Sequence, residues 1–195
     1  MNSKVGVIGC GRMGLPICGH LVRGGYTVLG SDVDTSRRSA VERVGADWSD
    51  DVASLGRDCE FVLLCVGFED EIRDVVFGAG LAAAMRPDSV LVVLSTVSPH
   101  AVRDWAALLS GRGVHVLDAS VCRGGWAAEE GTLLSFVGGT TDVFARIEPV
   151  VRTYSSDVVH AGEVGTGQVC KAVNNMILWA CLVADHEGLA LARRY

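Results

Sequence analysis

A glycine-rich segment near the N-terminus has the spacing of a loop that holds phosphate groups. It follows an apolar run, opens a helical one, and consists of Gly9, Gly11, Arg12, Met13 and Gly14 in the pattern GxGxxG. In such a loop, glycine lets the backbone turn tightly and approach a pyrophosphate, which the N–H groups at the helix start attract. Asp32 follows the next apolar run, where a carboxylate can accept hydrogen bonds from ribose hydroxyls. The segment therefore predicts a dinucleotide site; the alternative is a glycine-rich turn that holds no ligand.

The charge of Asp32 favours one of two related dinucleotides. A carboxylate at this position repels the 2′-phosphate of NADP, so NAD is the expected cofactor. NADP stays the alternative because Arg37 and Arg38 follow closely and could offset the negative charge, although a solvated helix face suits them as well.

A lysine and two carboxamides share one face of a helical segment near the C-terminus. Gln168, Lys171 and Asn175 are spaced three and four residues apart, so they project to the same side. Lys4 and Lys171 are the only lysines among 17 basic residues, and lysine, unlike arginine, can lose its proton. Beside a nicotinamide ring, Lys171 could exchange a proton with a carbonyl oxygen if burial or a neighbouring charge eases its deprotonation, and Asn175 could orient the substrate. The alternative is a surface lysine on an amphipathic helix.

Apolar strand-like runs alternate with helical patterns through most of the chain. The runs are Val5–Cys10, Tyr26–Gly30, Phe61–Val66, Val90–Leu94, Val114–Leu117 and Leu133–Val137, with a short seventh at Val158–His160. The helical patterns are Met13–Arg23, Thr35–Arg43, Glu69–Met85, Pro99–Leu109 and Thr141–Thr153. Continuous apolar strands that alternate with helices are typical of a parallel sheet covered on both faces. The pattern predicts an α/β fold with a Rossmann-like, doubly wound and mostly parallel sheet.

The last segment, Gly165–Tyr195, has helical spacing and contains neither a strand pattern nor a proline. Its middle is apolar almost all round, which is typical of a buried helix. We therefore expect a dinucleotide-binding domain at residues 1–163 and a long helix at residues 164–195.

The composition excludes several classes of protein. The chain has 195 residues, of which 49% are hydrophobic and 21% charged, and its net charge of −6 argues against nucleic acid as a partner. The longest stretch without Asp, Glu, Lys or Arg, Ser89–Val102, has 14 residues, whereas a membrane-spanning helix needs about 20. Seven scattered cysteines form no CxxC pair, which predicts reduced thiols in a cytoplasmic protein and no metal site.

Four blocks of the sequence resemble the β-hydroxyacid dehydrogenase family, whose members include 3-hydroxyisobutyrate dehydrogenase and tartronate semialdehyde reductase. They are GVIGCGRMGLPI at 6–17, LSTVSP at 94–99, DASVCRGGWAAEEGTLLSFVGG at 118–139 and GEVGTGQVCKAVNNMI at 162–177. The resemblance implies hydride transfer between NAD(H) and a small 3-hydroxy acid or its semialdehyde. It implies Lys171 as the general acid/base and Asn175 as a substrate ligand. It also implies Thr96 near the nicotinamide ribose and Val66 along the cofactor, although Gly67 replaces a proline that the family often has.

The third block departs from the family pattern at the expected substrate loop. The family typically reads Asp-Ala-Pro-Val-Ser-Gly-Gly, whereas this chain reads Asp-Ala-Ser-Val-Cys-Arg-Gly at residues 118–124. We expect Cys122, Arg123 and Gly124 to bind a small anionic substrate, with Cys122 a weaker donor than serine. The Arg123 guanidinium could grip a carboxylate, which would indicate a substrate of altered shape or with a second acidic group. The alternative is that this side chain points outward and only its backbone N–H matters.

The resemblance also sets expectations for the C-terminal segment. Family members continue into an all-helical domain that closes the substrate cleft and pairs two subunits, so we interpret residues 164–195 as the start of such a domain. We expect a homodimer formed through this helix. Three alternatives to the dehydrogenase remain: a non-catalytic dinucleotide-binding protein, a truncated remnant, and a related imine or carbonyl reductase.

Overall fold

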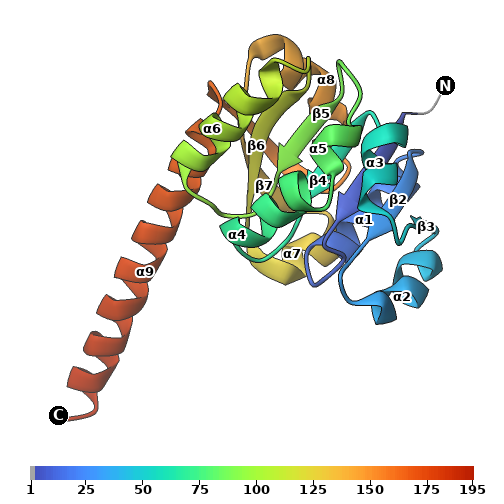
Figure 1. Ribbon diagram of the computed structural model, residues 1–195. Helices are drawn as coiled ribbons and strands as arrows, with labels where there is room; N and C mark the ends of the chain where they lie inside the picture. The colour runs from blue at the N-terminus through green and yellow to red at the C-terminus, as the bar shows by residue number, and fades with distance from the viewer. Residues whose placement is uncertain (1–2) are drawn as a thin grey trace.

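An eight-stranded sheet forms the centre of the computed structural model, which describes residues 3–195 (Figure 1). The strands are β1 (Lys4–Ile8), β2 (Thr27–Ser31), β3 (Asp47–Trp48), β4 (Phe61–Leu64), β5 (Val90–Val93), β6 (His115–Cys122), β7 (Leu133–Gly138) and β8 (Ser155–Gly162). Their order is β3-β2-β1-β4-β5-β6-β7-β8, and every neighbouring pair is parallel except the antiparallel pair β6–β7. The predicted α/β, doubly wound and mostly parallel sheet is confirmed.

The strand order places the end of the sheet where a ligand is expected to bind. From β1 the chain winds outward through β2 to β3, and then returns to β4 on the other side of β1. In open α/β sheets, such a change of direction leaves a crevice outside the carboxyl ends of the two central strands. The glycine-rich loop follows β1 at this crevice.

Helices cover both faces of the sheet and close a hydrophobic core on each. One face carries α1 (Gly14–Arg23), α2 (Arg38–Arg43), α7 (Gly124–Glu130) and α8 (Thr141–Val151), with a 3₁₀ turn at Thr35–Arg37 before α2. The other face carries α3 (Val52–Asp58), α4 (Glu69–Arg73), a π-helical turn at Asp74–Gly78, α5 (Leu81–Ala84) and α6 (Pro99–Ser110). The two cores hold the sheet rigid beneath the crevice.

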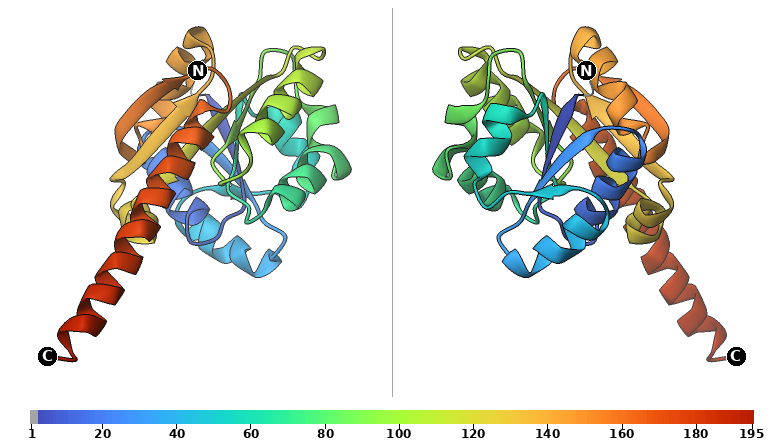
Figure 2. Two further views of the ribbon diagram at one scale, coloured as in Figure 1. Left: turned by 90° about the vertical axis from the view of Figure 1, so that its left-hand side faces the viewer. Right: turned by 90° about the vertical axis from the view of Figure 1, so that its right-hand side faces the viewer.

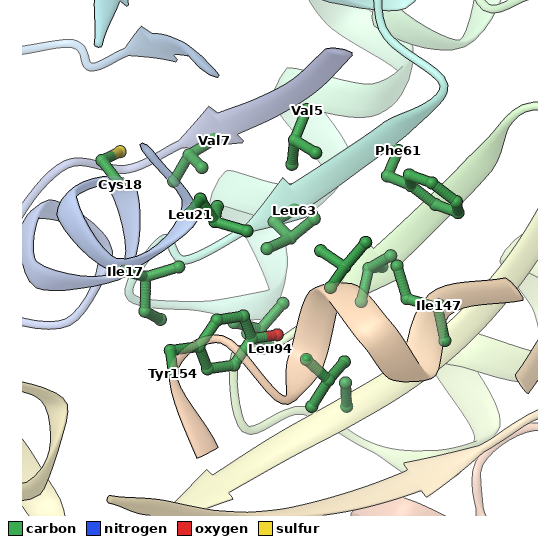
Figure 3. Close-up of a cluster of buried hydrophobic side chains, with 14 of the residues drawn as sticks. Val5, Val7, Ile17, Cys18, Leu21, Phe61, Leu63, Leu94, Ile147 and Tyr154 are labelled. Atoms are coloured by element: carbon green, nitrogen blue, oxygen red, sulfur yellow. The ribbon is translucent and has the colours of Figure 1, made fainter. Parts of the chain in front are cut away.

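The core under α1 and α8 shows how the apolar runs are used. Side chains from β1, β4, α1 and α8 converge there, among them Val7, Leu63, Ile17 and Ile147, all fully buried (Figure 3). Burying one such side chain contributes roughly 1.5–3 kcal/mol. Tyr154 fills the same core; its hydroxyl has no hydrogen-bond partner among the described residues, and burial raises the pKa of this phenol.

Local backbone chemistry divides one helix that the sequence pattern predicts as continuous. The segment Glu69–Met85 forms α4, the π-helical turn and α5, with an interruption at residues 79–80. Gly80 has a left-handed backbone with φ of +80°, which ends helical propagation. The short elements β3, α3 and α7 are absent from the sequence prediction, because each is too brief for periodicity to reveal.

The predicted C-terminal helix is observed as α9, Thr166–Ala192. Its first turns pack against β6 and β7, and Gly167 and Gln168 are its buried residues. The remainder stands clear of the domain in every view (Figures 1 and 2). Within residues 3–195, none of the helices is both long and apolar enough to cross a membrane.

Candidate active site

Two neighbouring cavities lie at the carboxyl ends of the central strands. The larger, of about 690 Å³, is lined by residues that include Gly9, Gly11, Asp32 and Val66. The smaller, of about 250 Å³, is lined by Met13, Cys65, Val66, Leu94, Ser95, Thr96, Val121, Gly124 and Lys171. Val66 and Cys65 line both cavities, so the two form one path across the crevice. Eight of the predicted site residues line this path.

The glycine-rich loop fits a dinucleotide on steric grounds. Gly9 has φ of +90°, and a Cβ there would lie 2.7 Å from the carbonyl of Cys65. A Cβ at Gly14 would collide with the carbonyl oxygen of Gly9, so the start of α1 can pack here only with glycine. Gly11, in contrast, has no atom within 4 Å of its Cβ position and faces open space. Two glycines thus hold the loop tight, and the third leaves room for a pyrophosphate.

Asp32 stands at the edge of the larger cavity with its carboxylate fixed. The backbone N–H of Cys10 donates to Oδ2 at 2.6 Å, and that of Asp34 donates to Oδ1 at 2.9 Å. A carboxylate oxygen can accept more than one hydrogen bond, so both oxygens of Asp32 can still accept from ribose hydroxyls. Arg12, exposed at the loop tip, lies against α7, because a Cβ on Gly125 would be 3.2 Å from its Cδ.

Lys171 lies at the smaller cavity, together with the predicted Met13, Val66, Thr96 and Gly124. It is half-buried in the second turn of α9, and its Nζ donates to the carbonyl oxygen of Val121 at 2.8 Å. The same nitrogen lies 3.6 Å from Cys122 Sγ. The side chains of Lys171 and Cys122 are thus brought together across α9 and β6, as the sequence predicts for one site.

Asn175 follows Lys171 by one helical turn and is half-buried. Its Oδ1 accepts a weak bond of 3.4 Å from Asn174 Nδ2. Its remaining hydrogen-bonding capacity is therefore available beside the lysine.

A buried carboxylate fixes the start of α9. Asp118 on β6 is fully buried, and its two oxygens accept from the backbone N–H groups of Gly165 and Gln168, both at 2.6 Å. Burial raises the pKa of this carboxyl, although the two N–H bonds act in the opposite direction. Gly138 and Gly167 make room for it, since a Cβ at Gly167 would lie 2.7 Å from Oδ2. Asp118 therefore sets where α9 begins, and with it the position of Lys171.

The Arg123 guanidinium is directed away from the expected grip on a substrate carboxylate. Its Nη1 donates to the carbonyl oxygen of Thr132 at 2.9 Å, to Ser156 Oγ at 3.0 Å and to Asp157 Oδ2 at 2.7 Å. The bonds that Asp157 accepts from Arg123 and from Ser156 Oγ hold the pKa of its carboxyl below its usual range. The guanidinium is thus already paired, and the geometry agrees with the alternative in which only the Arg123 backbone adjoins the site.

Sequence reasoning missed two residues that hold the site. It placed Asp118 in the substrate loop, whereas β6 extends to Cys122 and makes Asp118 an internal strand residue. It noted Gln168 only as a neighbour of Lys171 on a helix face. An acidic residue that directly follows a predicted buried run and precedes further small and apolar residues is the signal that could have revealed Asp118. Across residues 3–195, no group of three or more His, Cys, Asp or Glu side chains could hold a metal ion.

Comparison with known proteins identifies a family and relatives of this chain. Residues 4–162 match the family described as the NAD-binding domain of 6-phosphogluconate dehydrogenase. The chain belongs to this family. Its relatives include a 3-hydroxyisobutyrate dehydrogenase of Pseudomonas aeruginosa, 31% identical over 97% of this chain and 64% of that protein. The predicted resemblance to hydroxyacid dehydrogenases and the predicted NAD cofactor are confirmed.

Solved structures agree with this family assignment. The Mycobacterium tuberculosis 3-hydroxyisobutyrate dehydrogenase, described with L-serine, superposes with a TM-score of 0.94 at 28% identity over 100% of this chain and 66% of that one. An imine reductase variant from Myxococcus stipitatus, in complex with NAD⁺, has a TM-score of 0.91 at 21% identity over 99% of this chain and 66% of that one, which shows a shared fold. The chain thus spans about two thirds of the length of these proteins.

Proposed function

We propose that this chain transfers a hydride between NAD(H) and a small 3-hydroxy acid or its semialdehyde. The observation that carries the proposal is the position of Lys171, whose amine lies at a cavity that directly adjoins the dinucleotide cavity. The name of the Pseudomonas aeruginosa relative supports the substrate class. In this proposal residues 1–163 form the dinucleotide-binding domain, and residues 164–195 form the helix that carries the lysine.

The larger cavity would hold the adenosine and pyrophosphate end of the cofactor. Gly9, Gly11 and Gly14 bring the backbone and the start of α1 to the phosphates, with Arg12 and Met13 at the loop tip. Asp32 would accept from the ribose hydroxyls and repel a 2′-phosphate, which favours NAD over NADP. When bound, the dinucleotide supplies or accepts the hydride.

Lys171 would manage the proton that accompanies hydride transfer. In the reducing direction Nζ gives a proton to the carbonyl oxygen of the substrate, and in the oxidising direction it takes one from the hydroxyl. Its bond to the Val121 carbonyl oxygen keeps the amine at the mouth of the smaller cavity. Thr96 and Val66 line the same cavity and would face the nicotinamide ribose.

The substrate carboxylate would bind beside the lysine. Cys122 and Asn175 offer polar side-chain atoms on either side of Lys171, and the chain adjoins the cavity again at Gly124. A short chain spanning Lys171 and these groups would place its 3-hydroxyl at Nζ. This arrangement suits a small anionic substrate, as the resemblance implies.

The deciding experiment compares cofactor binding with turnover in two lysine variants. We expect the unmodified chain to bind NADH in a fluorescence titration and to oxidise small 3-hydroxy acids. Lys171→Ala should lower turnover about 10²- to 10⁴-fold, because a positioned acid/base contributes that much, and should leave the NADH Kd unchanged. The matched control is Lys4→Ala, since the amine of Lys4 pairs with Asp58 at 3.6 Å and Lys4 begins β1, at the opposite end of that strand from the glycine-rich loop.

Two outcomes would count against the proposal. NADH binding without turnover of any small hydroxy acid or semialdehyde would indicate a non-catalytic dinucleotide-binding protein. Equal turnover in Lys171→Ala and Lys4→Ala would remove the lysine from the chemistry.

We also propose that the chain forms a homodimer through α9. The exposed fractions of Met176, Ile177 and Trp179 are 64%, 56% and 64%, so a single turn of α9 presents three large apolar side chains. Contiguous apolar surface of this kind marks contact with other protein.

A further inference from the structure

The structure assigns Gln168 a positioning role: its carboxamide ties the loop that carries Thr96 to the helix that carries Lys171. The inference rests on the proposed function and deepens it, because Thr96 and Lys171 both line the smaller cavity but belong to different elements. What sets the distance between them therefore decides how a nicotinamide ribose and a proton donor meet.

Both ends of the Gln168 carboxamide bond to the loop. Nε2 donates to the carbonyl oxygen of Ser95 at 2.7 Å, and Oε1 accepts from the N–H of Val97 at 3.1 Å. The two partners flank Thr96 on either side, while Thr96 itself is exposed. The side chain of Gln168 is only 1% exposed, so water does not compete strongly for these bonds. The N–H of Ser95 still donates to the carbonyl oxygen of Leu64 at 3.3 Å, and the carboxamide holds the backbone that follows.

A further hydrogen bond connects Ser95 with Val66, another residue that lines the cavity. Ser95 Oγ donates to the carbonyl oxygen of Val66 at 2.6 Å, and Val66 lines both cavities. On the other side, the N–H of Gln168 donates to Asp118, which fixes the start of α9. One residue therefore connects the buried carboxylate of β6 with the two loops that follow β4 and β5.

The spacing on α9 explains why a residue at this position can act on the lysine. Lys171 follows Gln168 by three residues, which places both on one helix face about one turn apart. The side chain of Gln168 bonds to the Ser95 carbonyl oxygen after β5, and that of Lys171 bonds to the Val121 carbonyl oxygen on β6. Neighbouring turns of α9 therefore bond to two different segments beside the cavity. If the carboxamide were lost, the loop around Thr96 would lose both of its side-chain hydrogen bonds to α9.

The experiment uses the full 195-residue chain and three variants. Gln168→Met keeps the length of the side chain and removes both hydrogen bonds. Gln168→Glu keeps the acceptor for Val97 but turns a carboxylate toward the Ser95 carbonyl oxygen until it is protonated. The control Ser89→Ala removes another buried side-chain hydrogen bond, from Ser89 Oγ to the Arg86 carbonyl oxygen at 2.6 Å, at the opposite end of β5.

We expect Gln168→Met to raise the NADH Kd about tenfold, because one or two buried bonds that hold the ribose wall are lost. Amide hydrogen exchange at Val97 should accelerate in the same variant. Gln168→Glu should bind weakly at pH 8.5 and recover toward the unmodified Kd at pH 6, because a protonated carboxyl can donate to Ser95 as the carboxamide does. The unmodified chain and Ser89→Ala should show no such recovery.

The outcomes separate this inference from the proposed function. If the unmodified chain binds NADH and Gln168→Met binds equally well, the positioning role is overturned while the proposed function stands. The same holds if Ser89→Ala weakens NADH binding as much as Gln168→Met does. If the unmodified chain binds neither NADH nor NADPH, the proposed function is wrong and the positioning role falls with it.

Discussion

Arg123 combines a strained backbone with a paired side chain. Its φ is +82°, a left-handed conformation that suits glycine and costs other residues roughly 1–2 kcal/mol. Glycine is also what the resembling family has at this position. The hydrogen bonds from the guanidinium Nη1 to Thr132, Ser156 and Asp157 offset part of this strain. Arginine at this position therefore contributes to the contact between the start of α7 and the strands β7 and β8 more directly than to substrate binding.

We expect Arg123→Gly to leave both stability and substrate binding almost unchanged. Glycine relieves the left-handed strain, while the exposed pair with Asp157 contributes little in solvent. The apparent KM for 3-hydroxyisobutyrate should change less than about twofold, and the Tm should move by only a few degrees. A KM that rises tenfold or more would show that the guanidinium leaves Asp157 to bind the substrate. Arg152→Gly, which removes an exposed pair with Glu148 on α8, is the control for the loss of a surface arginine.

At the scale of elements, α9 owes its placement to a carboxylate on another strand. Asp118 caps the first turn from β6, and Lys171 reaches back to Val121 on the same strand. Two contacts on one strand, one before and one after the first turn of the helix, fix both its start and its direction. The site is therefore assembled by the packing of α9 on β6, which are separated by more than 40 residues in sequence.

We expect Asp118→Asn to destabilise the chain by about 1–3 kcal/mol, since the amide NH2 must face one of the two backbone N–H donors, whereas a protonated carboxyl can turn its single hydrogen away and still accept from both. Burial raises the pKa of Asp118 above 3.8 in the folded state, so the folded chain keeps this proton to a higher pH than the unfolded chain does. The stabilisation from this group is therefore full below pH 3.8 and is lost as pH rises through the raised pKa.

The difference in unfolding free energy between the unmodified chain and Asp118→Asn should thus be largest at the acid end and shrink toward neutral pH. Urea titrations at a series of pH values measure it. Asp142→Asn is a control of opposite sign, because the pKa of the exposed Asp142 is lowered. A difference that grows as the pH rises from 4 toward 7 would contradict the burial of a costly charge.

At the scale of the whole molecule, α9 leaves the domain and presents apolar side chains to solvent. Its first turns are buried against the sheet, whereas Met176, Trp179 and Val183 are 64%, 64% and 56% exposed (Figure 2). The apolar pattern that predicts a buried helix is therefore unsatisfied within the described residues.

We expect the unmodified chain to self-associate at micromolar concentrations, and the double variant Trp179→Asn, Val183→Asn to shift it toward monomer. Sedimentation velocity measures the shift. Leu108→Asn on α6 is a matched control, since Leu108 is also 64% exposed but lies on a different helix. The dimer would be excluded by a monomeric unmodified chain, or by an equal shift in Leu108→Asn.

Long or chemically marked elements were predictable from the sequence, whereas short ones were not. The strands around β1, β4 and β5 and the helix α9 follow from continuous apolar runs and from regular spacing. The break at Gly80 depended on one left-handed residue, and α3 and α7 on tertiary packing of a few residues each. The cofactor residues share a local motif and could be found together, but Asp118 and Gln168 act through partners far along the chain.

By itself, the sequence determined the α/β class, the glycine loop with Asp32, and the presence of Lys171 and Asn175 on one helix face. These are local properties, because backbone freedom, charge and helical periodicity are set within a few residues. The tertiary structure alone decided that Lys171 contacts Cys122 and lines one cavity with Thr96, that Arg123 pairs with Asp157, and that Asp118 and Gln168 hold α9 on the sheet. Those outcomes depend on which buried donors and acceptors meet once the helices have packed on the sheet, and no local pattern encodes that pairing.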